Sequence, residues 1–308
     1  MAWMEILAPA KVNLFLELLK RRDDGFHELE TIMAPVNLFD RIMLRRRSDE
    51  TIRLRSALPT FENHPQQFSM PADRSNLIWR AIDLLGQACN RKFGVDVIVE
   101  KRIPNQAGMG GGSSDAASTL LAINRMFSLQ QTRRQLLDLA SQLGSDVAFF
   151  IDRGIARCTG RGEIIQPITD CPRLDLVLAM PPTGLSTAQV FQQCCISSTP
   201  PSSDRLLQGL RHGSLQQIGQ GMGNRLQSTA EQLSPWVKRL AQEFARLPSI
   251  GHQMTGSGSA YFGIFANSQI TRQAKRILKN RLPECSLFCV STVGRTTNVI
   301  RYPSIQER

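Results

Sequence analysis

The sequence is short of the residues that metal sites and disulfide frameworks need. It has only four histidines, which lie far apart, and its seven cysteines form no C-x-x-C pair. Zinc sites and disulfide frameworks place such residues at short, regular spacings, so we predict neither, and no protein metal site. Free cysteines in an odd number are typical of a reducing compartment, and we expect a cytoplasmic protein.

Long apolar runs are missing as well. No stretch reaches the roughly 18 apolar residues that a membrane span needs, and Glu5 and Lys11 interrupt the apolar N-terminus, which does not resemble a signal peptide. Hydrophobic residues make up 42% and charged residues 20% of the 308 residues. That balance is typical of a globular protein with one or two domains.

The chain has fewer acidic than basic residues, and its formal net charge is +11. A basic protein suits anionic partners, which include phosphorylated small molecules, nucleic acids and membranes. The run Arg45-Arg46-Arg47 looks like a nucleic-acid patch, although short runs of this kind are most often solvated faces. Composition alone does not choose among these partners.

The most distinctive stretch is a glycine-rich segment between a predicted strand at 95–100 and a predicted helix at 116–124. It has glycine at four of the five positions 108–112, followed by Ser113 and Ser114. Glycine lets a ligand approach the backbone closely, and the free N–H groups at a helix start attract phosphate. We predict a phosphate-binding loop, with one of the two serines as the helix N-cap.

Two familiar phosphate motifs do not fit this loop. A Walker A loop continues with lysine where this chain has Ser113, and the dinucleotide fingerprint G-x-G-x-x-G requires a third glycine at that same position. An ordinary glycine-rich turn remains the alternative.

Three segments together resemble the motifs of one enzyme family: 9–14 (Pro-Ala-Lys-Val-Asn-Leu), 103–117 and 254–265. In order and composition they are similar to the GHMP kinases, a family that includes galactokinase, homoserine kinase and mevalonate kinase. The resemblance implies phosphotransfer from ATP with Mg²⁺, in which the loop wraps the phosphates and the two serines help to hold phosphate and Mg²⁺.

The same resemblance implies a fold. We expect an α+β protein of two domains, with mixed and antiparallel sheets covered by helices and an active-site cleft between the domains. The expected division is an N-terminal ATP- and phosphate-binding domain at 1–169 and a C-terminal domain at 170–308.

Site residues follow by matching positions. Lys11 lies in the first motif, and Asp146 lies in Gly-Ser-Asp-Val-Ala-Phe, which resembles the family's Gly-x-Asp-Val-Pro-Phe with alanine for proline; the resemblance makes both catalytic. The family places an asparagine and a lysine near adenine. The implied ATP-binding residues are Asn76, Lys101, Pro104, Asn105, Gln106, Ala107, Gly108, Met109, Gly110, Gly111, Gly112, Ser113 and Ser114.

The segment 21–31 narrows the resemblance to family members that act on a cytidine diphosphate-linked methylerythritol. It reads Arg-Arg-Asp-Asp-Gly-Phe-His-Glu-Leu-Glu-Thr, with Phe26 where tyrosine is usual. In those members the aromatic residue and the histidine hold cytosine, so Phe26 keeps a stacking face but offers no hydroxyl. The implied substrate-binding residues are Asn13, Phe26, His27, Thr187, Phe191, Gly256 and Ser257.

Less specific interpretations stay open. Lys11 could point to solvent, Phe26 could pack in the core, and Asp146 could be a helix N-cap. The alternatives for function are another GHMP kinase, of homoserine or mevalonate type, and an RNA-binding protein. We expect ATP and a small-molecule substrate as ligands, no nucleic acid and no membrane, and a monomer or weak homodimer.

Overall fold

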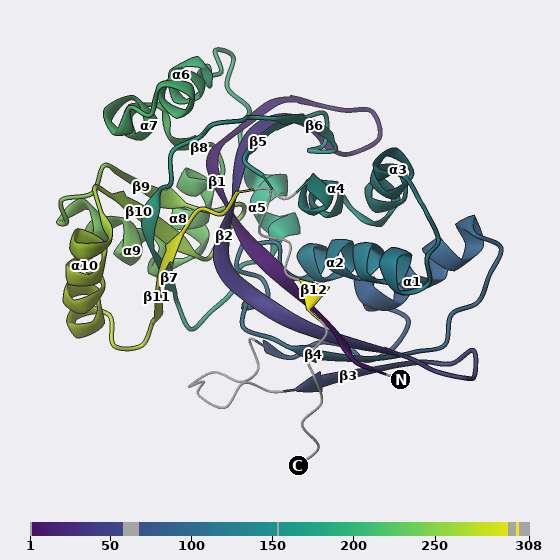
Figure 1. Ribbon diagram of the computed structural model, residues 1–308. Coiled ribbons are helices and arrows are strands. Elements are labelled where there is room, and N and C mark those ends of the chain that lie inside the picture. The colour runs from purple at the N-terminus through teal and green to yellow at the C-terminus, as the bar shows by residue number, and fades with distance from the viewer. Residues whose placement is uncertain (1, 58–67, 153, 295–299, 302–308) are drawn as a thin grey trace.

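The computed structural model describes residues 2–57, 68–152, 154–294 and 300–301. A long antiparallel hairpin runs through its middle (Figure 1). The hairpin consists of β1 (Met4–Arg21) and β2 (His27–Arg46), joined by a turn in which Gly25 has a φ of 84°. The register of the hairpin shifts between Pro9 and Ala10, because proline cannot donate to a sheet ladder.

The hairpin is the centre of the larger sheet, which has eight strands in the described residues, with the path β12-β1-β2-β4-β3. β4 pairs antiparallel with β2, while β3 and β4 are parallel. Three strands lie off this path: β5 and β6 form a hairpin on β2, and β8 pairs with β1. The further bounds are β3 (Ile52–Ala57), β4 (Val95–Glu100), β5 (Ala156–Thr159), β6 (Ile164–Pro167), β8 (Gly223–Asn224) and β12 (Ile300–Arg301).

Four helices cover one side of this sheet (Figure 1). They are α1 (Leu77–Ala88), α2 (Gly111–Met126), α3 (Arg133–Leu143) and α4 (Ser145–Asp152). Apolar residues at helical spacing bury one face of α1 against the core shared with β4. The hydroxyl of Thr132 caps α3 in a capping box, and Gly144 ends the helix, as its sequence predicts.

The second sheet is antiparallel throughout, in the order β11-β7-β10-β9. One face packs on α8–α10 through Val177, Tyr261 and Phe244, and the other on α6 and α7 through Leu178 and Phe262. Its strands are β7 (Asp175–Met180), β9 (Gly251–Met254), β10 (Tyr261–Phe265) and β11 (Ser286–Ser291). The helices are α5 (Thr187–Gln193), α6 (Asp204–His212), α7 (Leu215–Gly221), α8 (Gln227–Leu233), α9 (Pro235–Ala245) and α10 (Ser268–Arg281).

The predicted α+β class with mixed and antiparallel sheets is confirmed. The predicted division at 169/170 falls in the connection between β6 and β7, and each side of it builds most of one sheet. Since β8 and β12 cross over to pair with β1, the two parts are joined through the larger sheet as well. The division itself stays a prediction.

One local prediction is wrong. Helix α2 begins at Gly111, not near residue 116, and its N-cap is Gly110, with a φ of 69° and no capping side chain. Ser113 and Ser114 therefore lie inside the first turn. Four glycines hid the helix start, because glycine is a weak helix former and carries no pattern of its own.

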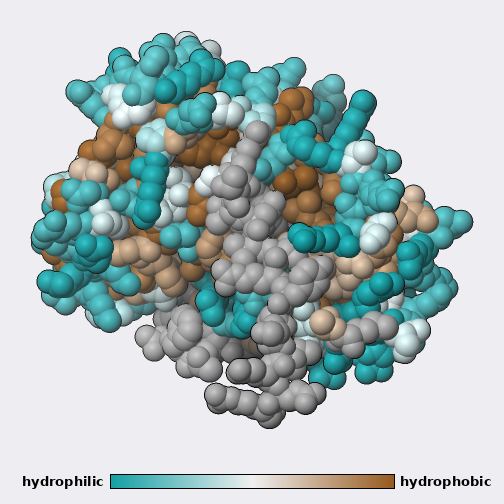
Figure 2. Space-filling model, viewed as in Figure 1, coloured by the Kyte–Doolittle hydropathy of each residue, from teal (hydrophilic) through white to brown (hydrophobic). Residues whose placement is uncertain are grey.

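Each arginine of the run at 45–47 interacts with a neighbouring side chain in the fold. Arg45 and Arg47 donate to the carboxylate of Asp96, and the Arg46 guanidinium lies 4.5 Å from the centre of the Phe127 ring. Each of these cations therefore has a partner within the fold. Figure 2 shows hydrophilic residues around the periphery of one face and apolar residues gathered toward its middle. No helix within the described ranges is long and apolar enough to span a membrane.

Candidate active site

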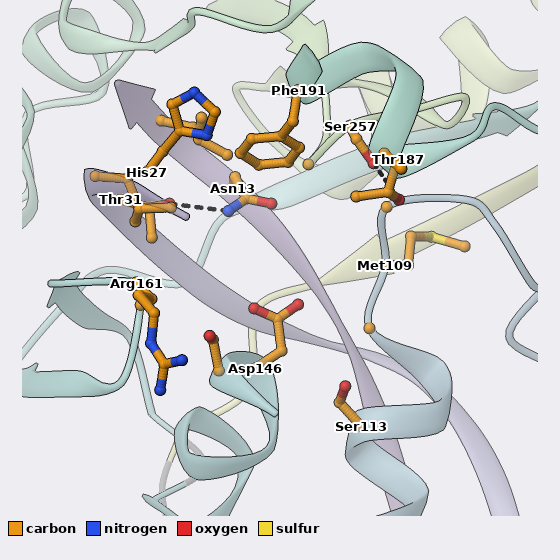
Figure 3. Close-up of a pocket in the computed structure, with 18 of the residues that line it drawn as sticks. Asn13, His27, Thr31, Met109, Ser113, Asp146, Arg161, Thr187, Phe191 and Ser257 are labelled. Carbon is orange, nitrogen blue, oxygen red and sulfur yellow. Dashed lines mark hydrogen bonds between the residues drawn. The ribbon is translucent and has the colours of Figure 1, made fainter. Parts of the chain in front are cut away.

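A cavity of about 1250 Å³ collects the motifs of the sequence in one place. Its walls come from β1, the β1–β2 turn, the glycine loop, the start of α4, α5 and the turn after β9 (Figure 3). Most predicted site residues line it, namely Lys11, Asn13, Phe26, His27, Pro104, Asn105, Gln106, Ala107, Gly108, Met109, Gly110, Gly111, Gly112, Ser113, Asp146, Thr187, Phe191, Gly256 and Ser257. Asn76, Lys101 and Ser114 are not among the lining residues.

The glycines of the first loop serve different purposes. A Cβ on Gly108 would lie 2.1 Å from the carbonyl oxygen of Thr255, so this glycine lets the loop contact the turn after β9. A Cβ on Gly110 would lie 2.9 Å from the Phe150 ring. Only Gly112 has room on its Cβ side, where the nearest atom is a methyl of Leu77 at 3.9 Å.

The start of α2 provides the donors that a phosphate needs. No side chain caps this helix, and Gly111, Gly112 and Ser113 of its first turn line the cavity. The first N–H groups of a helix have no intrahelical acceptor. Together with the helix dipole they suit an anion, so this helix start is compatible with the predicted phosphate loop, which stays a prediction.

Lys11 and Asp146 face each other beside this helix start. Lys11 Nζ lies 3.6 Å from Asp146 Oδ2 and donates to Asn13 Oδ1 at 2.6 Å. The Asn13 amide in turn donates to Thr31 Oγ1 at 2.8 Å (Figure 3). Lys11 is only 3% exposed, whereas the Asp146 side chain is 38% exposed in the first turn of α4. The lysine is held in place while the carboxylate stays open to a ligand, so the solvent interpretation of Lys11 is wrong.

Aromatic residues form the far end of the cavity. The rings of His27 and Phe191 lie 5.7 Å apart, tilted by 42°. Burial and the neighbouring Arg21 lower the pKa of His27 below its usual value, so this imidazole is neutral at pH 7 and can donate and accept. Thr187 and Ser257 share a hydrogen bond of 2.8 Å, which ties α5 to the turn after β9.

Phe26 is 53% exposed, so its interpretation as a core residue is wrong. The guanidinium of Arg161 lies 4.9 Å from the centre of its ring. Arg161 also lines the cavity, and the sequence analysis missed it because Thr-Gly-Arg-Gly-Glu reads only as a hairpin turn. A basic residue between two glycines was the one available signal.

The structure places three of the predicted ATP-binding residues outside the cavity lining, and their assignment stays a prediction. The Asn76 side chain caps α1 by accepting the N–H of Ile78, and it donates to the carbonyl of Pro71. Lys101 is buried between the carboxylates of Asp40 and Asp115. Ser114 is fully buried, and its hydroxyl has no hydrogen-bond partner among the described residues. Their side chains support the loop and its neighbours from behind.

Comparison with known proteins agrees with this geometry. The models of the GHMP kinases N terminal domain and of the GHMP kinases C terminal match residues 76–154 and 206–284. A 4-diphosphocytidyl-2-C-methyl-D-erythritol kinase of Alkaliphilus metalliredigens (strain QYMF) is 35% identical over 87% of this chain and 89% of the relative. The chain belongs to the GHMP kinase family.

Other GHMP kinases show the same similarity. A 4-diphosphocytidyl-2-C-methyl-D-erythritol kinase of Shouchella clausii (strain KSM-K16) is 37% identical over 84% of each chain. A crystal structure of 4-(cytidine 5'-diphospho)-2C-methyl-D-erythritol kinase has a TM-score of 0.78 and 32% identity, covering 94% of this chain and 99% of that one. A homoserine kinase from Cytophaga hutchinsonii ATCC 33406 also has a TM-score of 0.78, over 98% of both chains, but at 17% identity it supports the fold alone.

Proposed function

We propose that the protein is an ATP-dependent kinase that phosphorylates a hydroxyl of 4-diphosphocytidyl-2-C-methyl-D-erythritol, giving the 2-phosphate in the non-mevalonate isoprenoid pathway. The observation that carries this proposal is one cavity in which Lys11 and Asp146 lie between the donors of α2 and the His27–Phe191 aromatic end. The relatives named above support the choice of substrate.

The chain's own groups account for the transfer. Phosphoryl transfer depends on positioning and on charge stabilisation more than on covalent help. The N–H groups at the start of α2 would hold the ATP phosphates, and the Lys11 ammonium, fixed by Asn13, would stabilise negative charge on the transferred group. The Asp146 carboxylate would accept a hydrogen bond from the acceptor hydroxyl and orient its oxygen toward the phosphorus.

The residues present fit Mg²⁺. This ion keeps several waters and takes one or two carboxylates together with nucleotide phosphates. The parts of the chain that are described contain no group of three or more His, Cys, Asp or Glu able to hold a metal by themselves. The Asp146 carboxylate and the Ser113 hydroxyl both face the cavity and would hold the ion. Bound there, Mg²⁺ would neutralise phosphate charge.

A coupled ADP-release assay tests the proposal, with the cytidine substrate, homoserine and mevalonate as acceptors. Among the three acceptors, we expect only the cytidine substrate to give ADP release above the ATPase background. Equal or faster release with homoserine or mevalonate would assign the protein to another branch of the family. Gel filtration at several concentrations would test the accompanying expectation of a monomer or weak homodimer.

A further inference from the structure

The turn between β5 and β6 connects the two ends of the cavity. At one end, Gly160 accepts the backbone N–H of Leu29, two residues after His27, at 2.8 Å. At the other end, a Cβ on Gly162 would lie 3.5 Å from the Cβ of Ser145, next to Asp146. Arg161 projects from the middle of this turn. In Figure 3 it lies on the same side of the cavity as His27 and Thr31, near the start of α4.

The Arg161 guanidinium keeps most of its donors available. Its closest carboxylate oxygen is Glu163 Oε1, 4.0 Å from Nε. The stronger contact of Glu163 is with the Arg161 backbone N–H, at 2.6 Å. Within the described part of the chain, no hydrogen bond from the terminal nitrogens of Arg161 is present. By contrast, Arg22 in the neighbouring turn donates to both Asp24 and Glu28.

Phe26 holds this cation in position. The guanidinium over its ring is a cation–π contact, and the Arg161 side chain stays about one-third exposed, at 34%. One face of Phe26 is therefore covered by arginine and unavailable to a base. The other face stays open, since Phe26 is 53% exposed, so Phe26 can orient a charge while it still borders the space for a base.

We propose that Arg161, oriented by Phe26, binds the diphosphate that links the nucleoside to the acceptor alcohol. This inference rests on the proposed function. A substrate with its base at the aromatic end of the cavity, beside Phe26, His27 and Phe191, and its hydroxyl at Asp146 must carry its linker past the turn that joins these two ends. Arginine suits the task because its planar fork donates two parallel hydrogen bonds to phosphate oxygens.

The test separates the linker from the base. CDP and cytidine are titrated calorimetrically into the wild type and into Arg161→Gln, Arg161→Lys and Arg173→Gln. Arg173 is the matched control, since it is an exposed arginine that does not line this cavity and lies 3.4 Å from the carboxylate of Asp175. We expect Arg161→Gln to weaken CDP about tenfold or more, as for a lost hydrogen bond to a charged group, and to leave cytidine unchanged. Arg161→Lys should recover part of the loss, and Arg173→Gln should match the wild type.

Steady-state kinetics supply the second measurement. Arg161→Gln should raise KM for the cytidine substrate by a similar factor while KM for ATP stays constant. Equal weakening of CDP and cytidine would show that Arg161 only props the aromatic end, and would overturn the proposal. So would unchanged CDP affinity, or an equal rise in KM for ATP. If the wild type neither binds CDP nor phosphorylates the cytidine substrate, the proposed function fails instead.

Discussion

Lys11 and Lys101 are both buried beside aspartate, yet the fold uses them differently. Both are almost fully buried, at 3% and 1% exposure, and both lie beside aspartate. Lys11 has one carboxylate, 3.6 Å away and open to the cavity, whereas Lys101 is enclosed by two carboxylates that are themselves buried. A buried lysine–aspartate pair is therefore no sign of a reactive site until it is placed against a cavity.

The electrostatics of the Lys101 cluster are those of a sealed structural site. Burial lowers the pKa of Lys101, but the carboxylates of Asp115 and Asp40 outweigh it and hold the pKa above its usual value. Burial raises the pKa of Asp115 to about 7, aided by Asp40 and opposed by Lys101. Asp40 also accepts the backbone N–H groups of Arg102 and Ile103. The cluster thus fixes the strand-to-loop connection directly ahead of the glycines.

The same substitution at the two lysines is the sharpest way to break this comparison, and Lys101→Met has the larger expected effect. Removing one partner of a buried ion pair leaves a charge uncompensated, which costs about 3–5 kcal/mol of unfolding free energy. Denaturant titration measures the loss, and kcat of the folded fraction should stay near the wild-type value. Adding Asp115→Asn should restore part of the stability. A hundredfold fall in kcat with unchanged stability would place Lys101 in the reaction.

Lys11→Met should show the opposite pattern. Loss of a positioned charge in the reaction lowers kcat about 10²-fold or more, and Asp146→Asn should do the same. The melting temperature of Asp146→Asn should stay close to wild type, since that side chain is partly exposed. Near-normal turnover in either variant, measured by ADP release, would remove the pair from the mechanism.

The next test is the pH dependence of stability, which reports on the buried cluster of Lys101, Asp40 and Asp115. With a folded pKa raised from 3.8 to about 7, Asp115 binds a proton in the folded state that the unfolded chain has already released. Stability relative to Asp115→Asn should therefore fall as pH rises from about 4 to 7, by at most about 1.4 kcal/mol per pH unit, and level off above. Urea titrations of both proteins across this range check the slope. Parallel curves would show that Asp115 ionises normally.

Gly111 and Gly112 allow the same comparison between a structural and a ligand-facing position, with the smallest expected effects. A Cβ on Gly111 would lie 3.0 Å from Ile103 and 3.3 Å from Lys101 Nζ, whereas one on Gly112 meets only the cavity wall. We expect Gly111→Ala to lower the melting temperature. Gly112→Ala should keep it, yet raise KM for ATP about fivefold, the scale of one weakened hydrogen bond of roughly 1 kcal/mol. Identical effects at both positions would contradict the division between a structural and a ligand-facing side.

The sequence predicted part of what local rules determine. The Thr132 cap and the Gly144 end of α3 depend on neighbours within a few residues, and both are present, whereas the start of α2 was predicted wrongly. The place of Lys101 depends on Asp40, which is 61 residues away in the chain. No spacing rule connects such distant positions, so the sequence did not reveal that Lys101 pairs with Asp40. The assignment of Lys101 to the nucleotide came from the family resemblance.

Most of the candidate site was predicted from the family resemblance, which does not depend on knowing which distant residues meet in the fold. The residues of the three motifs were named from the resemblance, and the fold brings nearly all of them to one cavity. The contact of Arg161 with Phe26 joins a hairpin turn to a residue far earlier in the chain. The pairing of β8 and β12 with β1 involves strands of only two residues, too short for any periodic pattern to show.

The contact between the two glycine turns limits how the enzyme can admit its substrates. The Ala260 N–H donates to the carbonyl of Ala107, and Gly108 lies against Thr255 with no space for a methyl group. The Asn224 side chain stabilises the same turn by donating to the carbonyls of Met254 and Gly256. These backbone contacts tie the two parts of the chain together beside the cavity, so we expect little hinge opening between them when nucleotide and alcohol bind.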